Sequence, residues 1–307
     1  MQQSSENHAT CMVLSKLAMV SQPDNFKQII NNQVSMSLFQ SSQNFVNELN
    51  GQKLVTSQEL NLIHCGYFGI AYLINDQVYI AHRGTVKNSP ANLAADLQIL
   101  KRQTPQFLLD EAQKYTESVM QSFKNRNVIH TGFSLGGYIA QQLIQLDADA
   151  VAVTFDAPGI KLNADQQLNE KCVNYVTNPN DVNTCNFHAG TVRQLEAYDR
   201  EPMKLVNIWS HNMNDLLLKQ SELFTQKILK YKDVNKWPHA IYQQIPVELP
   251  KKADIFKGLL GKIIGNIYDQ ALLTFTAQYD AEQKCYMGLK FVKYEPENVE
   301  YTENTFI

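Results

Sequence analysis

Hydrophobic and polar positions follow two different periods along this chain, one typical of strands and one typical of helices. Residues 67–74 and 77–82 are apolar and rich in β-branched and aromatic side chains, and Asn-Asp at 75–76 separates them, so they predict a hairpin. Residues 106–125 and 135–145 carry apolar side chains at helical spacing. Four other short apolar runs predict further strands: residues 127–131, 150–155, 172–177 and 205–209. Strands that alternate with helices predict a mostly parallel central sheet flanked by helices.

The two ends of the chain have a different pattern. Residues 13–20 have helical spacing, and the remainder of residues 1–61 consists of further helix and polar connections. Residues 215–232 and 255–272 also have helical periodicity, although three glycines weaken the second helix. That helix either packs on the core or faces a lipid surface or substrate. The sequence therefore predicts mainly helical flanks at both ends, the second of them over residues 221–307.

Composition narrows the class of protein. The 307 residues are 44% hydrophobic, which is enough for a buried core and excludes wholesale disorder. The net charge is −3 and no Lys/Arg stripe is present, so a nucleic-acid partner is excluded. Residues 1–10 have no basic segment, and no stretch is apolar enough to span a bilayer. We therefore expect no signal peptide or transmembrane segment, and either a cytoplasmic location or export by a non-classical route.

Cysteine spacing and cofactor motifs indicate a protein without a metal or a cofactor. The five cysteines are odd in number and show neither C-x-x-C nor any metal-ligand spacing, so we expect reduced, buried thiols. The sequence contains neither an H-E-x-x-H motif nor a dinucleotide-binding fingerprint. We therefore expect catalysis, if there is any, to depend on side chains alone.

A G-x-S-x-G motif occupies residues 132–136, between a predicted strand and a predicted helix. In such a motif the serine lies on a strained turn that exposes its hydroxyl, and the glycines let the backbone pass without a Cβ clash. The following helix presents free N–H groups and its positive end to a developing oxyanion. This context predicts that Ser134 is a nucleophile.

Seven segments, in order, resemble the class 3 lipases, the α/β-hydrolase family of fungal triacylglycerol lipases and plant-type phospholipases A1. They are residues 79–85 (YIAHRGT), 89–97 (SPANLAADL), 132–137 (GFSLGG), 154–159 (TFDAPG), 178–183 (NPNDVN), 187–190 (FHAG) and 210–216 (SHNMNDL). The resemblance covers residues 62–220. It implies an α/β-hydrolase fold, with a mostly parallel central sheet and extra N- and C-terminal helical segments. Residues 1–307 then form one elaborated domain, with residues 1–61 and 221–307 as flanks.

The resemblance also implies a catalytic triad of Ser134, Asp181 and His211. His211 follows a strand-like segment and precedes a helix, and the chain order Ser-Asp-His is the one expected for this fold. His239 is the alternative base. Asp156 is the alternative acid, because it directly follows the strand 150–155, at a position where the family usually has glycine.

The remaining histidines of the matched region have structural interpretations. His82 and His130 lie in predicted buried strands, so we expect core or hydrogen-bonded side chains. His188 belongs to the aromatic-His-x-Gly segment, which is usually structural in the family that the sequence resembles. None of these three is therefore expected to be the base.

The oxyanion hole needs two donors near the nucleophile. The backbone N–H of Leu135 is the first candidate, and Thr85, through its N–H and its hydroxyl, is the second. Arg83 is expected to brace the loop, and Asp96 to hold the segment after a short lid helix at 88–95. That lid lacks the tryptophan often found in the family, which argues against strong interfacial activation. Phe133 replaces the usual histidine of the motif, a change outside the triad.

These residues together predict a serine carboxylic-ester hydrolase of the lipase or phospholipase A1 type. An acyltransferase or a thioesterase with the same triad is one alternative, and a catalytically inactive hydrolase fold that only binds is another. The expected partner is an acyl ester or lipid substrate, with peripheral membrane contact through apolar surface as a possibility. No obligate protein partner is evident from the sequence.

Overall fold

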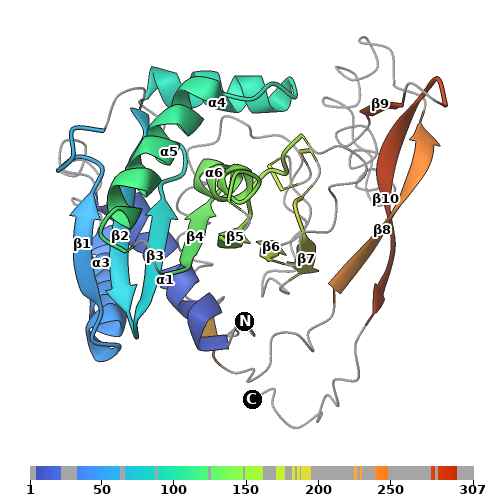
Figure 1. The fold of residues 1–307 in the computed structure, drawn as a ribbon. Helices are drawn as coiled ribbons and strands as arrows, with labels where there is room; N and C mark the ends of the chain where they lie inside the picture. Colours follow the sequence, from blue (N-terminus) through green and yellow to red (C-terminus); the bar gives the residue numbers. More distant parts are fainter. Residues whose placement is uncertain are drawn as a thin grey trace, which may run out of the picture.

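The computed structural model describes residues 5–21, 33–62, 66–86, 89–123, 126–147, 149–161, 171–176, 182–183, 185–186, 188–194, 225–226, 229, 239–247, 278–280 and 283–295. A seven-stranded sheet forms the centre of the described part, in the spatial order β1-β2-β3-β4-β5-β6-β7 (Figure 1). Its strands are β1 (Gln52–Thr56), β2 (Gly69–Ile74), β3 (Gln77–His82), β4 (Val128–Phe133), β5 (Val151–Phe155), β6 (Cys172–Val176) and β7 (Thr191–Gln194).

The first three strands are antiparallel to one another, and β3 to β7 run parallel. The predicted hairpin is confirmed: Asn75 and Asp76 form its turn with φ of 47° and 66°. Such left-handed angles favour Asn and Asp over most other residues. The predicted strands at 127–131, 150–155 and 172–177 are confirmed as β4, β5 and β6. The strands β1 and β7 were not predicted, and residues 205–209 lie outside the described residues.

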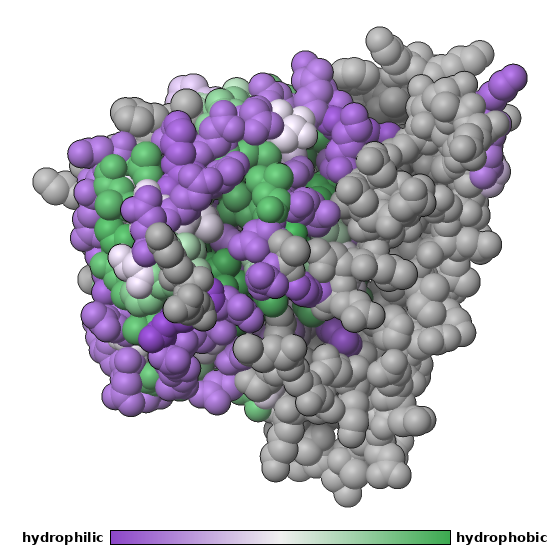
Figure 2. Space-filling view, in the orientation of Figure 1, coloured by the Kyte–Doolittle hydropathy of each residue, from purple (hydrophilic) through white to green (hydrophobic). Residues whose placement is uncertain are grey.

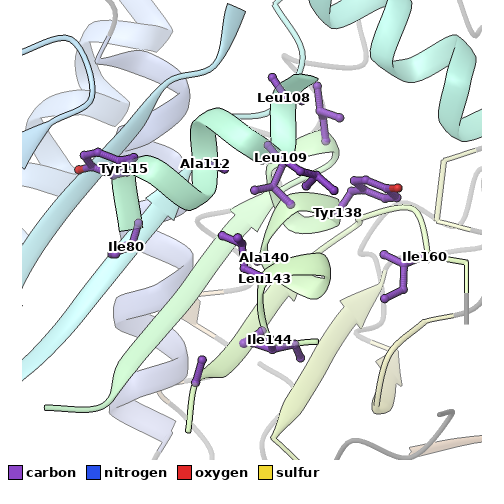
Figure 3. Packing of buried hydrophobic residues seen from close by; sticks show 14 of the residues in the cluster. Ile80, Leu108, Leu109, Ala112, Tyr115, Tyr138, Ala140, Leu143, Ile144 and Ile160 are labelled. Atoms are coloured by element: carbon purple, nitrogen blue, oxygen red, sulfur yellow. The ribbon is translucent and has the colours of Figure 1, made fainter. Parts of the chain in front are cut away.

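Helices cover both faces of the sheet, as expected for an α/β-hydrolase fold (Figure 1). Parallel strands in sequential order, joined by right-handed crossovers, place every connecting helix on the same face. The helices α4 (Pro90–Leu100), α5 (Gln106–Met120) and α6 (Leu135–Leu143) are these connections. Their apolar side chains pack with inward-facing residues of the strands such as Ile80 (Figure 3).

The N-terminal helices cover the opposite face. Helix α1 (Ser5–Val20) contacts β3, β4 and β5, and α3 (Gln33–Glu48) contacts α1. Eleven consecutive residues of α1, from His8 to Ala18, are buried. A helix enclosed in this way needs no amphipathic pattern, because its whole circumference is covered. The helical prediction for the N-terminal flank is confirmed, apart from the short strand β1 at its end.

The mainly helical prediction for residues 221–307 is wrong for most of its described residues. Here β8 (His239–Val247), β9 (Gln278–Asp280) and β10 (Cys285–Glu295) form an antiparallel sheet in the order β8-β10-β9. Residues Leu289, Lys290 and Phe291 alternate between apolar and charged side chains, which is the period of two typical of a strand. Described residues 225–226 and 229 are helical, whereas residues 255–272 lie outside the described part.

Candidate active site

Ser134 lies on the turn between β4 and α6, with φ of 49° and ψ of −123°. A non-glycine residue in such a sparsely populated conformation costs about 1–3 kcal/mol, and surrounding contacts must hold it there. The backbone N–H of Ser134 donates to the Phe155 carbonyl at 3.1 Å, and its own carbonyl accepts from the Tyr138 N–H at 3.0 Å. The predicted strand-turn-helix context is therefore present, with the serine in the strained conformation of a nucleophile elbow.

Two glycines allow the backbone to pack closely around this turn. A Cβ atom added at Gly132 would lie 2.3 Å from the carbonyl carbon of Gly136. One added at Gly136 would lie 2.0 Å from the carbonyl oxygen of His82, at the end of β3. Both distances are shorter than real Cβ contacts, so a side chain at either position would push α6 away from the strand ends.

The two predicted oxyanion donors lie on neighbouring parts of the sheet edge. Leu135 is the first residue of α6, where N–H groups have no partner within the helix. Thr85 follows β3, the strand beside β4. A Cβ atom added at Gly84, the residue before Thr85, would lie 2.9 Å from the Phe133 carbonyl oxygen, so this loop packs directly on the elbow.

Asp96 contacts Thr85, whereas the sequence predicted that it would hold the segment after the lid helix. The Thr85 hydroxyl lies 3.0 Å and 2.9 Å from the two carboxylate oxygens of Asp96 and donates to them. Burial raises the pKa of the Asp96 carboxyl to about 7, although the hydrogen bond from Thr85 opposes the shift. The charge of the Asp96 carboxyl, beside Thr85, therefore changes near neutral pH.

Arg83 and Asn92 fix the loop after β3, which carries Thr85, and helix α4 to the same carbonyl group. The Arg83 guanidinium donates to the Gly66 carbonyl at 3.2 Å and lies over the Phe68 ring, 4.9 Å from its centroid. The Asn92 side-chain amide donates to that carbonyl at 3.1 Å, and its oxygen accepts from the Val86 N–H at 3.0 Å. The bracing role expected for Arg83 is confirmed, whereas Asn92 was not predicted.

The histidines of β3 and β4 are core residues, as predicted. The Tyr67 hydroxyl lies 2.8 Å from His82 Nδ1, and His82 Nε2 lies 3.0 Å from His130 Nδ1. Burial lowers the pKa of His130 to about 4 and holds that of His82 well below its ordinary value. Both imidazoles are therefore neutral and are committed to this buried chain of hydrogen bonds.

His188 also has a structural contact. Its Nε2 lies 2.7 Å from the carbonyl oxygen of Asn183, and burial lowers the pKa of the imidazole. The alternative base His239 is the first residue of β8 and pairs with Glu295 of β10. The predicted acid Asp181 and the predicted base His211 lie outside the described residues, so both remain predictions.

The alternative acid Asp156 directly follows β5, next to the elbow in the sheet. It is buried and has a φ of 43°. Its N–H donates to the Tyr175 carbonyl at 2.8 Å, and its Oδ1 accepts from the Asn183 side-chain amide at 2.9 Å. The structure thus connects Asp156 to the segment after β6, a contact that neither local pattern nor spacing could reveal.

Four of the five cysteines lie among the described residues. Cys11, Cys172 and Cys185 are buried and Cys285 is half-buried, and none of these four described cysteines is in a disulfide. Neither a His/Cys/Asp/Glu cluster suited to a metal ion nor a helix able to cross a membrane occurs in this part of the chain.

The described surface is mostly hydrophilic on the face shown in Figure 2, with small hydrophobic areas between polar ones. Large apolar side chains that are exposed include Leu97 on α4 and Leu146 just after α6. They come from separate elements rather than from one apolar face. The described residues therefore add nothing to the expectation of peripheral membrane contact.

Similar solved structures include several fungal lipases. The triacylglyceride lipase of Rhizomucor miehei is 15% identical, with a TM-score of 0.40, over 61% of this chain and 78% of the lipase. A lipase from Rhizopus microsporus var. chinensis is 14% identical, with a TM-score of 0.39, over 62% of this chain and 74% of the lipase. Lipase II from Rhizopus niveus is 14% identical, with a TM-score of 0.39, over 63% of this chain and 81% of the lipase.

No family model and no curated protein matches the sequence. The three solved structures are lipases that are 14–15% identical to this chain.

Proposed function

We propose that this chain is a serine carboxylic-ester hydrolase of the lipase or phospholipase A1 type. The observation that carries the proposal is the backbone of Ser134, with φ of 49° and ψ of −123° between a parallel strand and a helix. A serine needs no such strain to serve as a turn residue. Backbone strain of this kind is common at functional sites, and in a strand-turn-helix motif it exposes the serine hydroxyl at the edge of the sheet.

The proposed reaction passes through an acyl-enzyme. Ser134 Oγ attacks the ester carbonyl carbon, and His211 accepts the hydroxyl proton, because a free serine is a weak nucleophile at neutral pH. The carbon–oxygen bond to the alcohol then breaks, and His211 returns the proton to the leaving alcohol. Water attacks the acyl-enzyme by the same relay and releases the acid. Asp181 orients the imidazole and stabilises its cation without accepting the proton.

The oxyanion of each tetrahedral intermediate is stabilised by the Leu135 N–H and by Thr85. Helix α6 supports this role, since its N-terminal N–H groups and its dipole favour negative charge. Loss of one such donor typically lowers the rate about 10²–10³-fold. The fixed Thr85–Asp96 contact means that the loop carrying the second donor is organised before substrate arrives.

The test is covalent labelling combined with ester turnover. The wild-type chain should react with a fluorophosphonate probe at Ser134 and should hydrolyse p-nitrophenyl esters. Ser134→Ala should abolish labelling and lower kcat by on the order of 10⁶, as removal of a triad serine does. Ser122→Ala, at an exposed serine just after α5, is the matched control and should leave both readouts at the wild-type level.

The result also separates the alternatives. Wild-type protein that is neither labelled nor active would identify an inactive hydrolase fold. Faster product formation when an alcohol acceptor is added would identify an acyltransferase, and preference for thioesters over oxygen esters would identify a thioesterase. Turnover restricted to short acyl chains would argue against a lipase.

A further inference from the structure

Asp156 occupies the same place after β5 that Ser134 occupies after β4. The two strands pair in parallel, with Phe133 opposite Phe155, so the two residues come one after the other along the same sheet edge. Both have a positive φ, of 49° for Ser134 and 43° for Asp156. The side chain of Asp156 is buried, with the residue only 1% exposed.

An aspartate at this position has two physical costs. A left-handed backbone costs a residue with a Cβ atom about 1–2 kcal/mol, which glycine would avoid. A buried carboxylate loses hydration and is tolerated only when hydrogen bonds or charges compensate. The carboxyl group of Asp156 therefore has a specific contact to maintain, and Asn183 provides one at 2.9 Å.

Asn183 belongs to the segment after β6. It lies two residues after Asp181, the proposed acid. Further contacts tie the same segment to its neighbours: the Gly159 N–H donates to the Cys185 carbonyl at 2.6 Å, and the Asn183 carbonyl lies 2.7 Å from His188 Nε2. The turn after β5 and the segment after β6 thus form one hydrogen-bonded unit beside the elbow.

Gln141 on α6 joins this unit to the helix that follows the nucleophile. Its side-chain nitrogen donates to the Pro158 carbonyl, and its side-chain oxygen accepts from the Ala189 N–H, both at 2.9 Å. The serine turn, the turn after β5 and the segment after β6 are therefore linked through buried polar groups. Within this unit the Asp156–Asn183 contact joins the turn after β5 to a residue two positions after Asp181.

We propose that Asp156 is a positioning residue, whose carboxylate holds Asn183 and thereby fixes the segment that brings the catalytic acid to the base. This inference rests on the proposed function. Its physical reason is that a triad acid acts through one directed hydrogen bond, and a displacement of about 1 Å can lower the rate about 10²-fold. The hydrogen-bond acceptor of Asp156 is the required feature, and its charge is secondary.

Two substitutions separate the hydrogen bond from the charge. Asp156→Asn keeps an oxygen that accepts from Asn183, so kcat should fall by no more than about tenfold. Asp156→Gly relieves the backbone but removes the acceptor, so kcat should fall about 10²-fold with KM nearly unchanged. Asp181→Asn, which changes the acid itself, should lower kcat about 10⁴-fold.

Asn183→Ala tests the same contact from its other side. It should lower kcat as Asp156→Gly does, and the loss in the double variant should be smaller than the two single losses combined, because both changes remove the hydrogen bond between these side chains. Tyr115→Phe is the stability control. It deletes the 2.6 Å hydrogen bond that the buried Tyr115 side chain of α5 donates to the Val55 carbonyl of β1. Thermal unfolding should rank it with Asn183→Ala, whereas its kcat should equal that of the wild type.

The outcomes are distinguishable. Suppose that Asp156→Asn lowers kcat about 10⁴-fold and that Asp181→Asn leaves kcat unchanged. Asp156 is then the acid itself, and the positioning role is overturned. Wild-type kcat in Asp156→Gly and Asn183→Ala would also overturn it. Wild-type protein without labelling or turnover would instead refute the proposed function, and the positioning role would fail with it.

Discussion

The carboxyl group of Asp96 lies beside Thr85, one of the two proposed oxyanion donors. It is half-buried, and it accepts the Thr85 hydroxyl on both oxygens. Since burial raises its pKa to about 7, the folded protein binds a proton there that an unfolded chain releases near pH 4. Asp96 therefore couples the stability of the fold to pH through a single group.

The sign of this coupling predicts the behaviour of Asp96→Asn. A raised pKa in the folded state gives stability that is complete below pH 4 and is lost as the pH rises through 7. The amide variant keeps an acceptor for Thr85 and has no such loss. Its free energy of unfolding, relative to the wild type, should therefore rise by about 2 kcal/mol between pH 5 and pH 8. Urea unfolding at both pH values measures the difference, and an equal difference at both would contradict the assignment.

Helix α4 shows how one element can be fixed along its whole length. Ser89 caps its start by accepting from the Asn92 N–H at 3.3 Å, and Pro90 begins its first turn. The Asn92 side chain bonds to the Gly66 carbonyl, and Asp96 bonds to Thr85. Near its end, the Ile99 side chain is buried in the core and its carbonyl accepts from the Asn186 amide at 3.1 Å.

A helix anchored in this way is not expected to swing away when a lipid surface appears. The rate with p-nitrophenyl butyrate should therefore rise smoothly through the solubility limit of the ester. A sharp increase above that limit would show that α4 opens at an interface.

Asn92→Ala should lower kcat, because it removes the acceptor of the half-buried Val86 N–H and one of the two donors to the Gly66 carbonyl, leaving Arg83 as the other. Each such hydrogen bond is worth about 0.5–1.5 kcal/mol. Gln98→Ala, on the same helix, is the control.

Elements with a strong local signal were the predictable ones. The hairpin turn at Asn75 and the elbow at Ser134 depend on neighbours in sequence, so residue types alone identified them. The strand β1 is only five residues long and gives a weak local signal. In β10 the alternation of apolar and charged side chains is short and follows residues with helical periodicity. The contact between Asp156 and Asn183 spans 27 positions and requires the folded sheet, so no local rule could supply it.

The whole molecule is organised by the sequential order of its parallel strands. Because the described crossover helices α4, α5 and α6 lie on one face, the other face of the sheet must be covered by other residues. Helix α1 does this, with α3 outside it. The core consequently has two layers, one around Tyr138 and Leu109 and another around Leu14 and Phe155. The N-terminal segment is thus an integral half of the core.

This arrangement predicts a large stability loss in α1. Leu14 is fully buried between α1 and the sheet layer, so Leu14→Ala should lower the free energy of unfolding by about 2–5 kcal/mol. Leu146→Ala removes the same atoms from a residue that is 65% exposed and should change it by less than about 0.5 kcal/mol. Urea unfolding compares them; similar losses in the two variants would mean that α1 is not part of the core.

The position of α1 also has a consequence for biosynthesis. Its apolar circumference emerges from the ribosome early, whereas the strands that bury it, β3 to β5, end only at Phe155. At about 5–20 residues per second, α1 waits on the order of ten seconds for its binding surface. During that interval it exposes Met12, Leu14 and Leu17 to the cytosol or to a chaperone. The nascent chain is therefore most vulnerable to aggregation between the synthesis of α1 and the completion of β5.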